Sequence, residues 1–393
     1  MTARAQAARP GIGARGRAVF ALGVLAFSAS IVLRSIFATT AGGGDPWRAG
    51  EWLINYSAGF IRRGLFGELL LRLAPHGEAV WVLLAAQLLC YALSYGYLIG
   101  AMAKRHFDWT SIALVCGPAA LPFVGWDPPG AFRKEILVFA SWACCAWARG
   151  ARSPARHLSW ALAGLLGYAV ATFSWEGSVF ALPVVLYLLV GGAPTADATR
   201  RRRAVAVAAV AVGVAAVGAV SALFSHGDVT TASTICARVR DAGLGGPTLC
   251  SGAIDAVGWS LERNVRDVRD ALPADTGYVL LIALAWLPAL TTSWFRRNRW
   301  WVLAIGVGVL PLYVIAYDWG RWTHLTAIGL AVGVLSSASA QERTRVWTPL
   351  STVLYVSLWG IPHFVGINGQ FSAMGLLVQL STYAQHAVGR ILG

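Results

Sequence analysis

Apolar stretches long enough to cross a membrane follow one another along the whole chain, separated by short polar segments. An α-helix of about 20 apolar residues spans the hydrocarbon core of a bilayer. Apolar runs bounded by charged residues predict about eleven or twelve such spans, near residues 18–38, 79–101, 109–126, 136–148, 158–173, 178–192, 204–224, 277–294, 300–317, 325–341, 347–361 and, more weakly, 372–389. We therefore predict an all-α, multi-pass integral membrane protein in which residues 1–393 form a single transmembrane domain.

The composition removes several other classes of protein. Hydrophobic residues make up 57% of the chain and charged residues 13%, whereas a soluble protein carries about 25% charged residues. An ordinary cytosolic enzyme, a disordered chain and a disulfide-rich secreted domain are excluded. The net charge of +14 comes from short basic clusters between apolar runs, which is typical of membrane orientation signals. We expect the lipid bilayer as a partner and no nucleic acid.

The distribution of Lys and Arg predicts a cytoplasmic N-terminus. In that orientation the cytoplasmic segments hold 18 basic residues and the opposite side holds 12, as the positive-inside rule favours. The first apolar run lacks a small-x-small cleavage site, so it is read as an uncleaved helix rather than a secretory signal. We place the chain in a bacterial inner (cytoplasmic) membrane with its active face toward the periplasm.

Most polar clusters fall on the outer side in this orientation. They occupy residues 39–78, 127–135, 174–177, 225–276, 318–324 and 363–371. Crowding ionisable groups at a membrane surface costs free energy, so several clusters on one face predict a functional site there.

The first outer loop, residues 39–78, contains candidate acids and cations. Asp45 precedes Pro46, which suits a helix cap, although the same carboxylate is also a candidate catalytic acid, with Glu51 as a second choice. An apolar stripe predicts an amphipathic helix lying in the headgroup plane, with members Ile61, Leu65, Leu69 and Leu73. Arg62 and Arg63 beside it suit either lipid headgroups or an anionic substrate.

The second outer cluster predicts an anion site. Two prolines and a glycine in the run WDPPGAFRKE form a rigid turn that directs Arg133 and Lys134, with Glu135 next to them. Arg binds phosphate bidentately and Lys acts as a point charge, so the pair suits phosphate or pyrophosphate. A pure orientation role is disfavoured because this side should be poor in cations.

Two further outer turns carry charged side chains. Glu176 lies in a tight turn, where it pairs with an outer arginine or contacts substrate. Asp318, Arg321 and His324 are spaced by three residues and share one face of a helix. An internal Asp–Arg pair is the alternative to a ligand-facing Arg and His.

The outer loop 225–276 is the one segment large enough for a lid or small domain. Within this loop, apolar residues repeat every three or four positions from Ile254 to Leu272, which predicts an amphipathic helix over residues 254–272. Cys236 and Cys250 share this loop, so we expect a disulfide between them in an oxidising compartment. No zinc, nucleotide or nicotinamide motif is present, so no resident cofactor is expected, with a divalent metal left open.

The first span followed by a large outer loop with an early acid and interfacial helices resembles the GT-C superfamily of membrane glycosyltransferases. This resemblance implies a polyprenyl-phosphate-linked sugar donor and a catalytic carboxylate at Asp45 or Glu51. The outer arginines also resemble those of O-antigen polymerases and ligases, which act on lipid-pyrophosphate glycans.

We therefore expect a glycosyltransferase of cell-surface polysaccharide assembly, with a glycan or lipid acceptor. Cations would stabilise the leaving phosphate, and a carboxylate or imidazole would act as general base. The candidate cations are Arg62, Arg63, Arg133, Lys134 and Arg321, the candidate bases are Asp45, Glu51 and His324, and Glu135, Glu176 and Asp318 complete the substrate site. The alternatives are a transporter or flippase of an anionic lipid or lipid-linked glycan, and a non-catalytic scaffold.

Overall fold

The computed structural model describes residues 12–74, 78–191, 198–225, 227–244, 248–275, 277–337, 346–364 and 375–392. Across these ranges the protein is all-helical, with 78% helix and no strand. Four of the described helices are long and apolar enough to cross a membrane: α1 (Ile12–Ala41), α4 (Ala79–Lys104), α10 (Ala198–Phe224) and α14 (Ser293–Ile315). This architecture fits the predicted all-α membrane protein.

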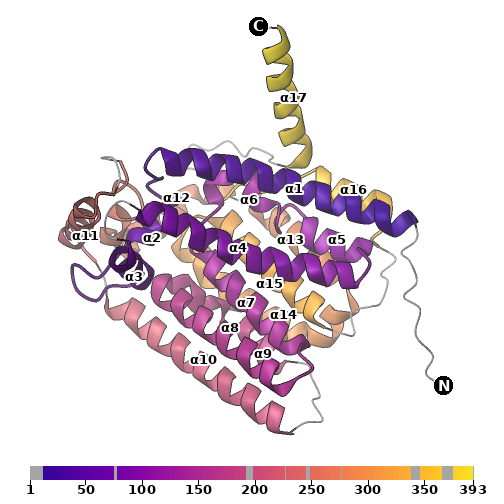
Figure 1. Ribbon diagram of the computed structural model, residues 1–393, viewed down its shortest axis with the longest axis horizontal. Helices are drawn as coiled ribbons and strands as arrows, with labels where there is room; N and C mark the ends of the chain where they lie inside the picture. The colour runs from indigo at the N-terminus through magenta and orange to yellow at the C-terminus, as the bar shows by residue number, and fades with distance from the viewer. Residues whose placement is uncertain are drawn as a thin grey trace.

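The bundle contains further, shorter helices, and α17 (Leu376–Leu392) extends from it (Figure 1). The others are α5 (Trp109–Cys116), α6 (Phe123–Trp126), η1 (Pro128–Gly130), α7 (Glu135–Gly150), α8 (Pro154–Ser174), η2 (Glu176–Ala181), α9 (Leu182–Val190), α13 (Tyr278–Leu290), α15 (Trp319–Ser336) and α16 (Pro349–Ser357). Each predicted apolar run contains helix. The prediction of one continuous helix over 109–126 is wrong, because Gly117 precedes a proline and the chain leaves the helix there.

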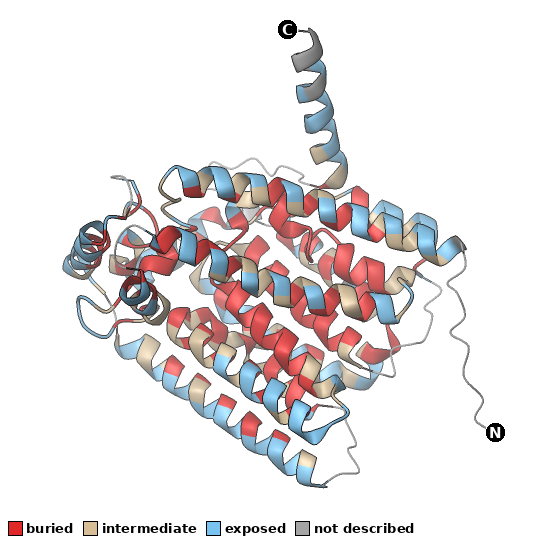
Figure 2. Ribbon diagram, in the orientation of Figure 1, coloured by how far each residue is buried: buried red, intermediate tan, exposed pale blue. Residues whose placement is uncertain are grey.

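Helices α7 and α15 form the centre of the bundle (Figure 1). α7 packs against α4, α8, α9 and α15, and α15 is buried from Gly320 to Leu335. A helix that is apolar on all sides belongs in an interior, which explains this position. Figure 2 shows the buried residues gathered at the centre and exposed residues on the outer helices.

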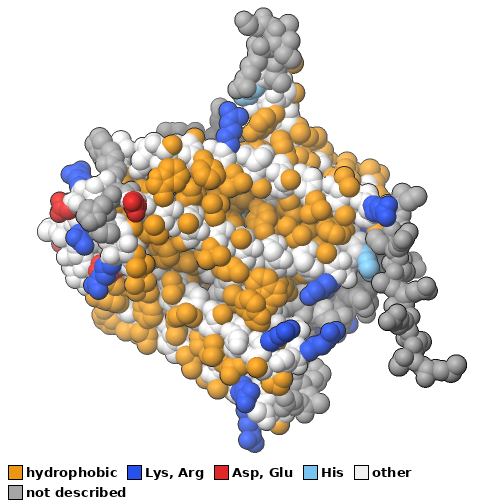
Figure 3. Space-filling view, viewed as in Figure 1, with side chains coloured by type: hydrophobic (Ala, Val, Ile, Leu, Met, Phe, Trp, Pro, Cys, Tyr) orange, Lys and Arg blue, Asp and Glu red, His pale blue; other side chains and the backbone are white. Residues whose placement is uncertain are grey.

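The outer helices expose apolar side chains. Val217 on α10 is 55% exposed and Leu310 on α14 is 57% exposed. Figure 3 shows a broad hydrophobic band across the middle of the face in view. Exposing a broad apolar band to water is unfavourable, whereas contact with lipid acyl chains is favourable. α17 projects from the bundle (Figure 1), which it meets through the side chains of Gln379 and Tyr383.

The two ends of the bundle differ. The short helices α2 (Gly50–Leu53), α3 (Leu65–Leu73), α11 (Val229–Asp241), η3 (Asp255–Gly258) and α12 (Leu261–Asp275) gather at one end, here called the loop end. On the face shown in Figure 3, acidic and basic side chains occur together at the loop end, whereas the opposite end, here called the basic end, shows Lys and Arg without acidic side chains.

The segment around Ala253 packs on the loop that follows α1. The backbone N–H of Ala253 donates to the carbonyl oxygen of Pro46 at 3.0 Å, and Leu249 is buried beside this contact. The prediction of one amphipathic helix from Ile254 to Leu272 is wrong. η3 ends at Gly258, where a side chain would meet the backbone of Asp228, and α12 begins only at Leu261.

Cys236 and Cys250, the pair expected from the sequence, are joined by a disulfide in this loop. The bond closes a loop of about 15 residues, for which the chain-entropy relation gives about 3 kcal/mol of stabilisation. We expect the Cys236→Ser, Cys250→Ser double variant to unfold its loop more readily, measured as faster proteolysis within residues 228–258. Thiol labelling of denatured wild-type protein should detect both cysteines only after reduction, and equal labelling before reduction would contradict the disulfide.

Candidate functional site

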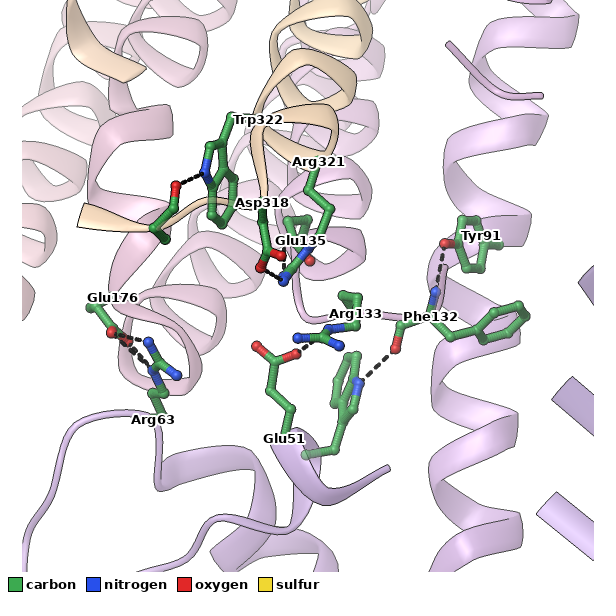
Figure 4. Close-up of polar contacts among 12 residues, drawn as sticks. Glu51, Arg63, Tyr91, Phe132, Arg133, Glu135, Glu176, Asp318, Arg321 and Trp322 are labelled. Atoms are coloured by element: carbon green, nitrogen blue, oxygen red, sulfur yellow. Dashed lines mark hydrogen bonds and ion pairs between the residues drawn. The ribbon is translucent and has the colours of Figure 1, made fainter. Parts of the chain in front are cut away.

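Nine charged side chains that are buried or partly buried meet at the loop end and are here called the charge network. Figure 4 labels its members other than Arg62 and Lys134. The cations are Arg62, Arg63, Arg133, Lys134 and Arg321, and the carboxylates are Glu51, Glu135, Glu176 and Asp318. They come from α2, from the segment before α3, and from the starts of α7, η2 and α15. Nine of the eleven site residues named from the sequence are therefore brought together.

Glu51 and Arg133 form the inner ion pair of the network. Glu51 is 3% exposed, and its Oε2 accepts a hydrogen bond from Arg133 Nε at 2.8 Å. Burial raises the pKa of the Glu51 carboxyl, but the surrounding cations together outweigh that effect, Arg133 and Arg321 most of all, so its pKa lies below the ordinary value. Glu51 is therefore ionised at neutral pH.

The turn before Arg133 is held in an unusual backbone conformation. Phe132 has a φ of 59°, in the left-handed region that non-glycine residues rarely adopt. Its N–H donates to the hydroxyl of Tyr91 at 3.1 Å, and its carbonyl accepts from Trp52 Nε1 at 2.9 Å and from Gln87 Nε2 at 3.0 Å. These three hydrogen bonds fix the direction of the cations that follow, which agrees with the rigid turn predicted from the two prolines.

Lys134 is buried without an ion pair. Its exposed fraction is 0%, and its Nζ donates to the carbonyl oxygen of Arg63 at 2.8 Å. Within the described residues, no carboxylate lies in ion-pair range of this ammonium group. Burial lowers its pKa to about 7, with Glu51 opposing the shift. Because an unpaired buried charge is costly, burial favours the neutral amine of Lys134, and an anion placed beside it would favour the charged form.

Arg321 bridges two carboxylates at the start of α15. Its Nη1 lies 2.6 Å from Oδ2 of Asp318, and its Nη2 contacts Oε1 of Glu135. Oε2 of Glu135 is buried and has no hydrogen-bond partner among the described residues. Asp318 keeps 25% of its side chain exposed, so this end of the network is open to the outside.

Arg63 and Glu176 form the pair nearest to α3. Arg63 Nε lies 2.6 Å from Oε2 of Glu176, and Arg62 Nη1 lies 3.7 Å from Oε1 of the same carboxylate. Arg63 has a φ of 71°, so it and Phe132 are two of the four described non-glycine residues with positive φ. Strained backbone of this kind occurs at functional sites more often than elsewhere.

Asp45 lies outside the charge network. Its Oδ1 accepts hydrogen bonds from the backbone N–H groups of Trp47 at 2.9 Å and Arg48 at 2.7 Å. The carboxylate therefore caps the turn that leads to α2, which is the first of its two sequence interpretations. Glu51, its alternative, is the carboxylate of this loop that enters the network.

His324 also lies outside the charge network, although it shares α15 with Arg321. Its Nδ1 is 2.9 Å from the carbonyl oxygen of Ala119, and its ring is 4.5 Å from that of Phe123 and 5.0 Å from that of Phe139. The three-residue spacing does place Asp318 beside Arg321. The His324 imidazole, however, points toward the rings of Phe123 and Phe139 and not toward the carboxylates.

A histidine that the sequence analysis did not single out lies beside the network. His363 Nδ1 is 2.7 Å from Oδ2 of Asp127, and the backbone N–H of His363 contacts the same oxygen. The carbonyl of His363 accepts from Gly320 N at 3.0 Å, which holds the imidazole next to the start of α15. Both residues lie in polar segments between apolar runs, and this position could have marked each as a candidate site residue. Their pairing could not be predicted from the sequence, because 236 positions separate them in the chain.

The Asp127–His363 pair is suited to proton transfer. Asp127 is 2% exposed, whereas 15% of the His363 side chain is exposed. A carboxylate that accepts from Nδ1 fixes the tautomer in which Nε2 is free to take a proton. The described residues contain no group of three or more His, Cys, Asp or Glu side chains that could hold a metal ion.

No protein-family model, curated protein or solved structure matches this chain. Its function is therefore argued from the chemistry of the charge network and of the Asp127–His363 pair.

The cost of burying Lys134 gives a prediction on pH. An unfolded lysine keeps its proton up to a pKa near 10.5, while Lys134 in the folded protein loses it near 7. The unfolded state thus binds more protons between these pH values, so wild-type stability rises across this window. We expect Lys134→Met to be at least as stable as wild type at pH 7, with its advantage shrinking as the pH approaches 10. Thermal unfolding in detergent measures this, and a pH-independent difference would contradict the assignment.

Proposed function

We propose that this protein is a multi-pass membrane glycosyltransferase. It would take a sugar or glycan from a polyprenyl-phosphate or polyprenyl-pyrophosphate carrier and transfer it to a glycan or lipid acceptor in cell-envelope polysaccharide assembly. The single observation that carries this proposal is the charge network, in which charged residues from separate outer loops meet at one end of an apolar bundle.

The proposed topology has about eleven or twelve spans, with the N-terminus in the cytoplasm and the loop end toward the periplasm of a bacterial inner membrane. The four long apolar helices and the exposed hydrophobic band support insertion in a membrane. The basic end supports this orientation, because cytoplasmic segments are enriched in Lys and Arg. The charge network then lies where a lipid-linked sugar presents its headgroup.

The balance of charge favours an anionic substrate. Glu51, Glu176 and the Glu135–Asp318 pair each have an arginine partner, whereas Lys134 has no carboxylate partner. A phosphate placed beside this ammonium group would supply the missing anion. As the bond between sugar and phosphate breaks, the phosphate gains charge, and fixed cations stabilise that charge more in the transition state than before it.

Apolar surface for the lipid chain lies next to this site. α3 exposes Leu69 (44%) and Leu73 (78%), two members of the predicted stripe, while its other side is buried against the bundle. An interfacial helix of this kind lies with its apolar face at the boundary between the lipid headgroups and the acyl chains. A polyprenyl chain could pass along α3 while its phosphate enters the network.

Two groups fit the remaining steps of the transfer. The ionised Glu51 suits stabilisation of positive charge on the sugar, which develops as the glycosidic bond breaks. The imidazole of His363, oriented by Asp127, suits removal of the proton from the acceptor hydroxyl. Both lie at the loop end, on the same side of the bundle as the unpaired lysine.

The experiment uses the full-length protein in nanodiscs with a radiolabelled polyprenyl-phosphate-linked hexose and membrane extract as the source of acceptor. We expect label to leave the donor and polyprenyl phosphate to be released, with the rate strongly reduced in the stable variant Lys134→Met. Arg72→Ala, an exposed arginine of α3, is the matched control and should retain full activity. In proteoliposomes of the same protein, movement of intact donor across the bilayer without its cleavage would instead show a flippase and overturn the proposal.

A further inference from the structure

A second polar site lies at the basic end, far from the charge network. A partly open cavity of about 140 Å³ is enclosed by the ends of α7 and α9 and the starts of α8 and α10. Its lining includes Arg149, His157, Arg200 and Arg201 together with Leu189 and Val205. A cavity of about 150 Å³ admits a molecule the size of benzene, so this one has room for a phosphate group.

Two cations of this cavity, Arg149 and Arg200, are held in place by backbone carbonyls. Arg149 Nη1 donates to the carbonyl oxygens of Tyr187, at 3.2 Å, and Gly191, and its guanidinium lies 4.9 Å from the centre of the Tyr187 ring. Arg200 Nη2 donates to the carbonyl oxygen of Arg149 at 3.1 Å. In the described part of the chain, no carboxylate lies within ion-pair distance of Arg149 or Arg201.

The cavity also has an apolar wall that continues onto the surface of α10. Val190 is 38% exposed and Val205 is 51% exposed beside the arginines, and Val212 further along α10 is 45% exposed. A ligand that satisfies both walls needs an anionic head and an apolar chain. Basic pockets between membrane helices on the cytoplasmic side bind the headgroups of anionic lipids in this way.

We infer that the cavity between α7, α8, α9 and α10 binds the phosphate headgroup of an anionic membrane lipid, with Arg149 and Arg201 as its contacts. The acyl chains would lie along the exposed valines of α10. This site is separate from the proposed transfer site, since it lies at the opposite ends of α7, α8 and α9, and it holds whether or not the chain is a glycosyltransferase.

Native mass spectrometry of the detergent-purified protein tests this site, with phosphatidylglycerol and phosphatidylcholine of equal chain length as probes. We expect preferential retention of phosphatidylglycerol by the wild type. Each arginine near an anionic headgroup contributes a factor of about five in affinity, so the Arg149→Ala, Arg201→Ala variant should lose about 25-fold. Arg203→Ala, an exposed arginine of α10 that does not line the cavity, should bind like the wild type.

Arg149 also caps the last turn of α9, so the double variant could fail to fold. Arg201→Ala removes an exposed side chain that makes no such contact, and it should still lose about fivefold in affinity. Equal retention of the two lipids by the wild type, or unchanged binding by Arg201→Ala, would overturn the proposal. Displacement of bound lipid by inorganic phosphate at equal concentration would identify a free-anion site and overturn the lipid assignment.

Discussion

Replacing Arg321 with methionine is expected to destabilise the protein by about 3–5 kcal/mol, because removal of one partner leaves buried carboxylates uncompensated. Arg321 is 4% exposed and serves both Glu135 and Asp318. Burial raises the pKa of the Asp318 carboxyl, but Arg321, Arg133 and His363 together bring it below its ordinary value, with Arg321 the largest of the three. Arg321 is also the main counter-charge of Glu135, so both carboxylates would lose their strongest partner. The measurement is unfolding in detergent, followed by the fraction of protein that remains monodisperse.

Two variants separate this effect from a general loss of charge. Arg263→Met removes a half-exposed arginine whose Nε is 3.9 Å from Asp267, and it should change stability by less than about 1 kcal/mol. Adding Glu135→Gln to Arg321→Met removes the more deeply buried unpaired carboxylate and should restore part of the loss. A loss at Arg321 as small as that at Arg263 would show that the network is not a buried ionic structure.

The second large effect concerns the rate of the proposed transfer. Arg133→Ala should reduce it by about 100-fold, or about 3 kcal/mol, because the guanidinium is lost from the side where the phosphate gains charge. Arg133→Lys should also be impaired, since a point charge cannot replace a bidentate guanidinium contact. The measurement is the transfer rate with the polyprenyl-phosphate-linked donor, normalised to folded protein.

Arg133 also compensates the buried Glu51, so a folding defect must be distinguished from a catalytic one. The Glu51→Gln, Arg133→Met double variant removes both charges of the pair and should recover folding without recovering activity. Full activity in Arg133→Ala would contradict the phosphate-binding role. Recovery of activity together with folding in the double variant would assign the pair a purely structural role.

Local patterns of the sequence determined much of the architecture. The apolar runs indicate helices because the free energy of transferring a segment to an apolar environment depends on that segment alone. The apolar run at 109–126 predicts one helix, although its Gly-Pro step, itself local information, ends α5. The polar clusters can likewise be located from the alternation of apolar runs and loops, without knowledge of any tertiary contact.

The sequence by itself determined the apolar helices, the polar clusters between them, the cysteine pair and the cations at 133 and 134. Only the tertiary structure decided that Glu51, rather than Asp45, meets Arg133, that Arg321 reaches Glu135, and that His363 pairs with Asp127. The physical reason is that a charged side chain pairs with an opposite charge within about 4 Å in space, however far apart the two residues are in the sequence. That neighbour is set by which helix ends share one end of the bundle, and hence by packing between segments as far apart as α7 and α15.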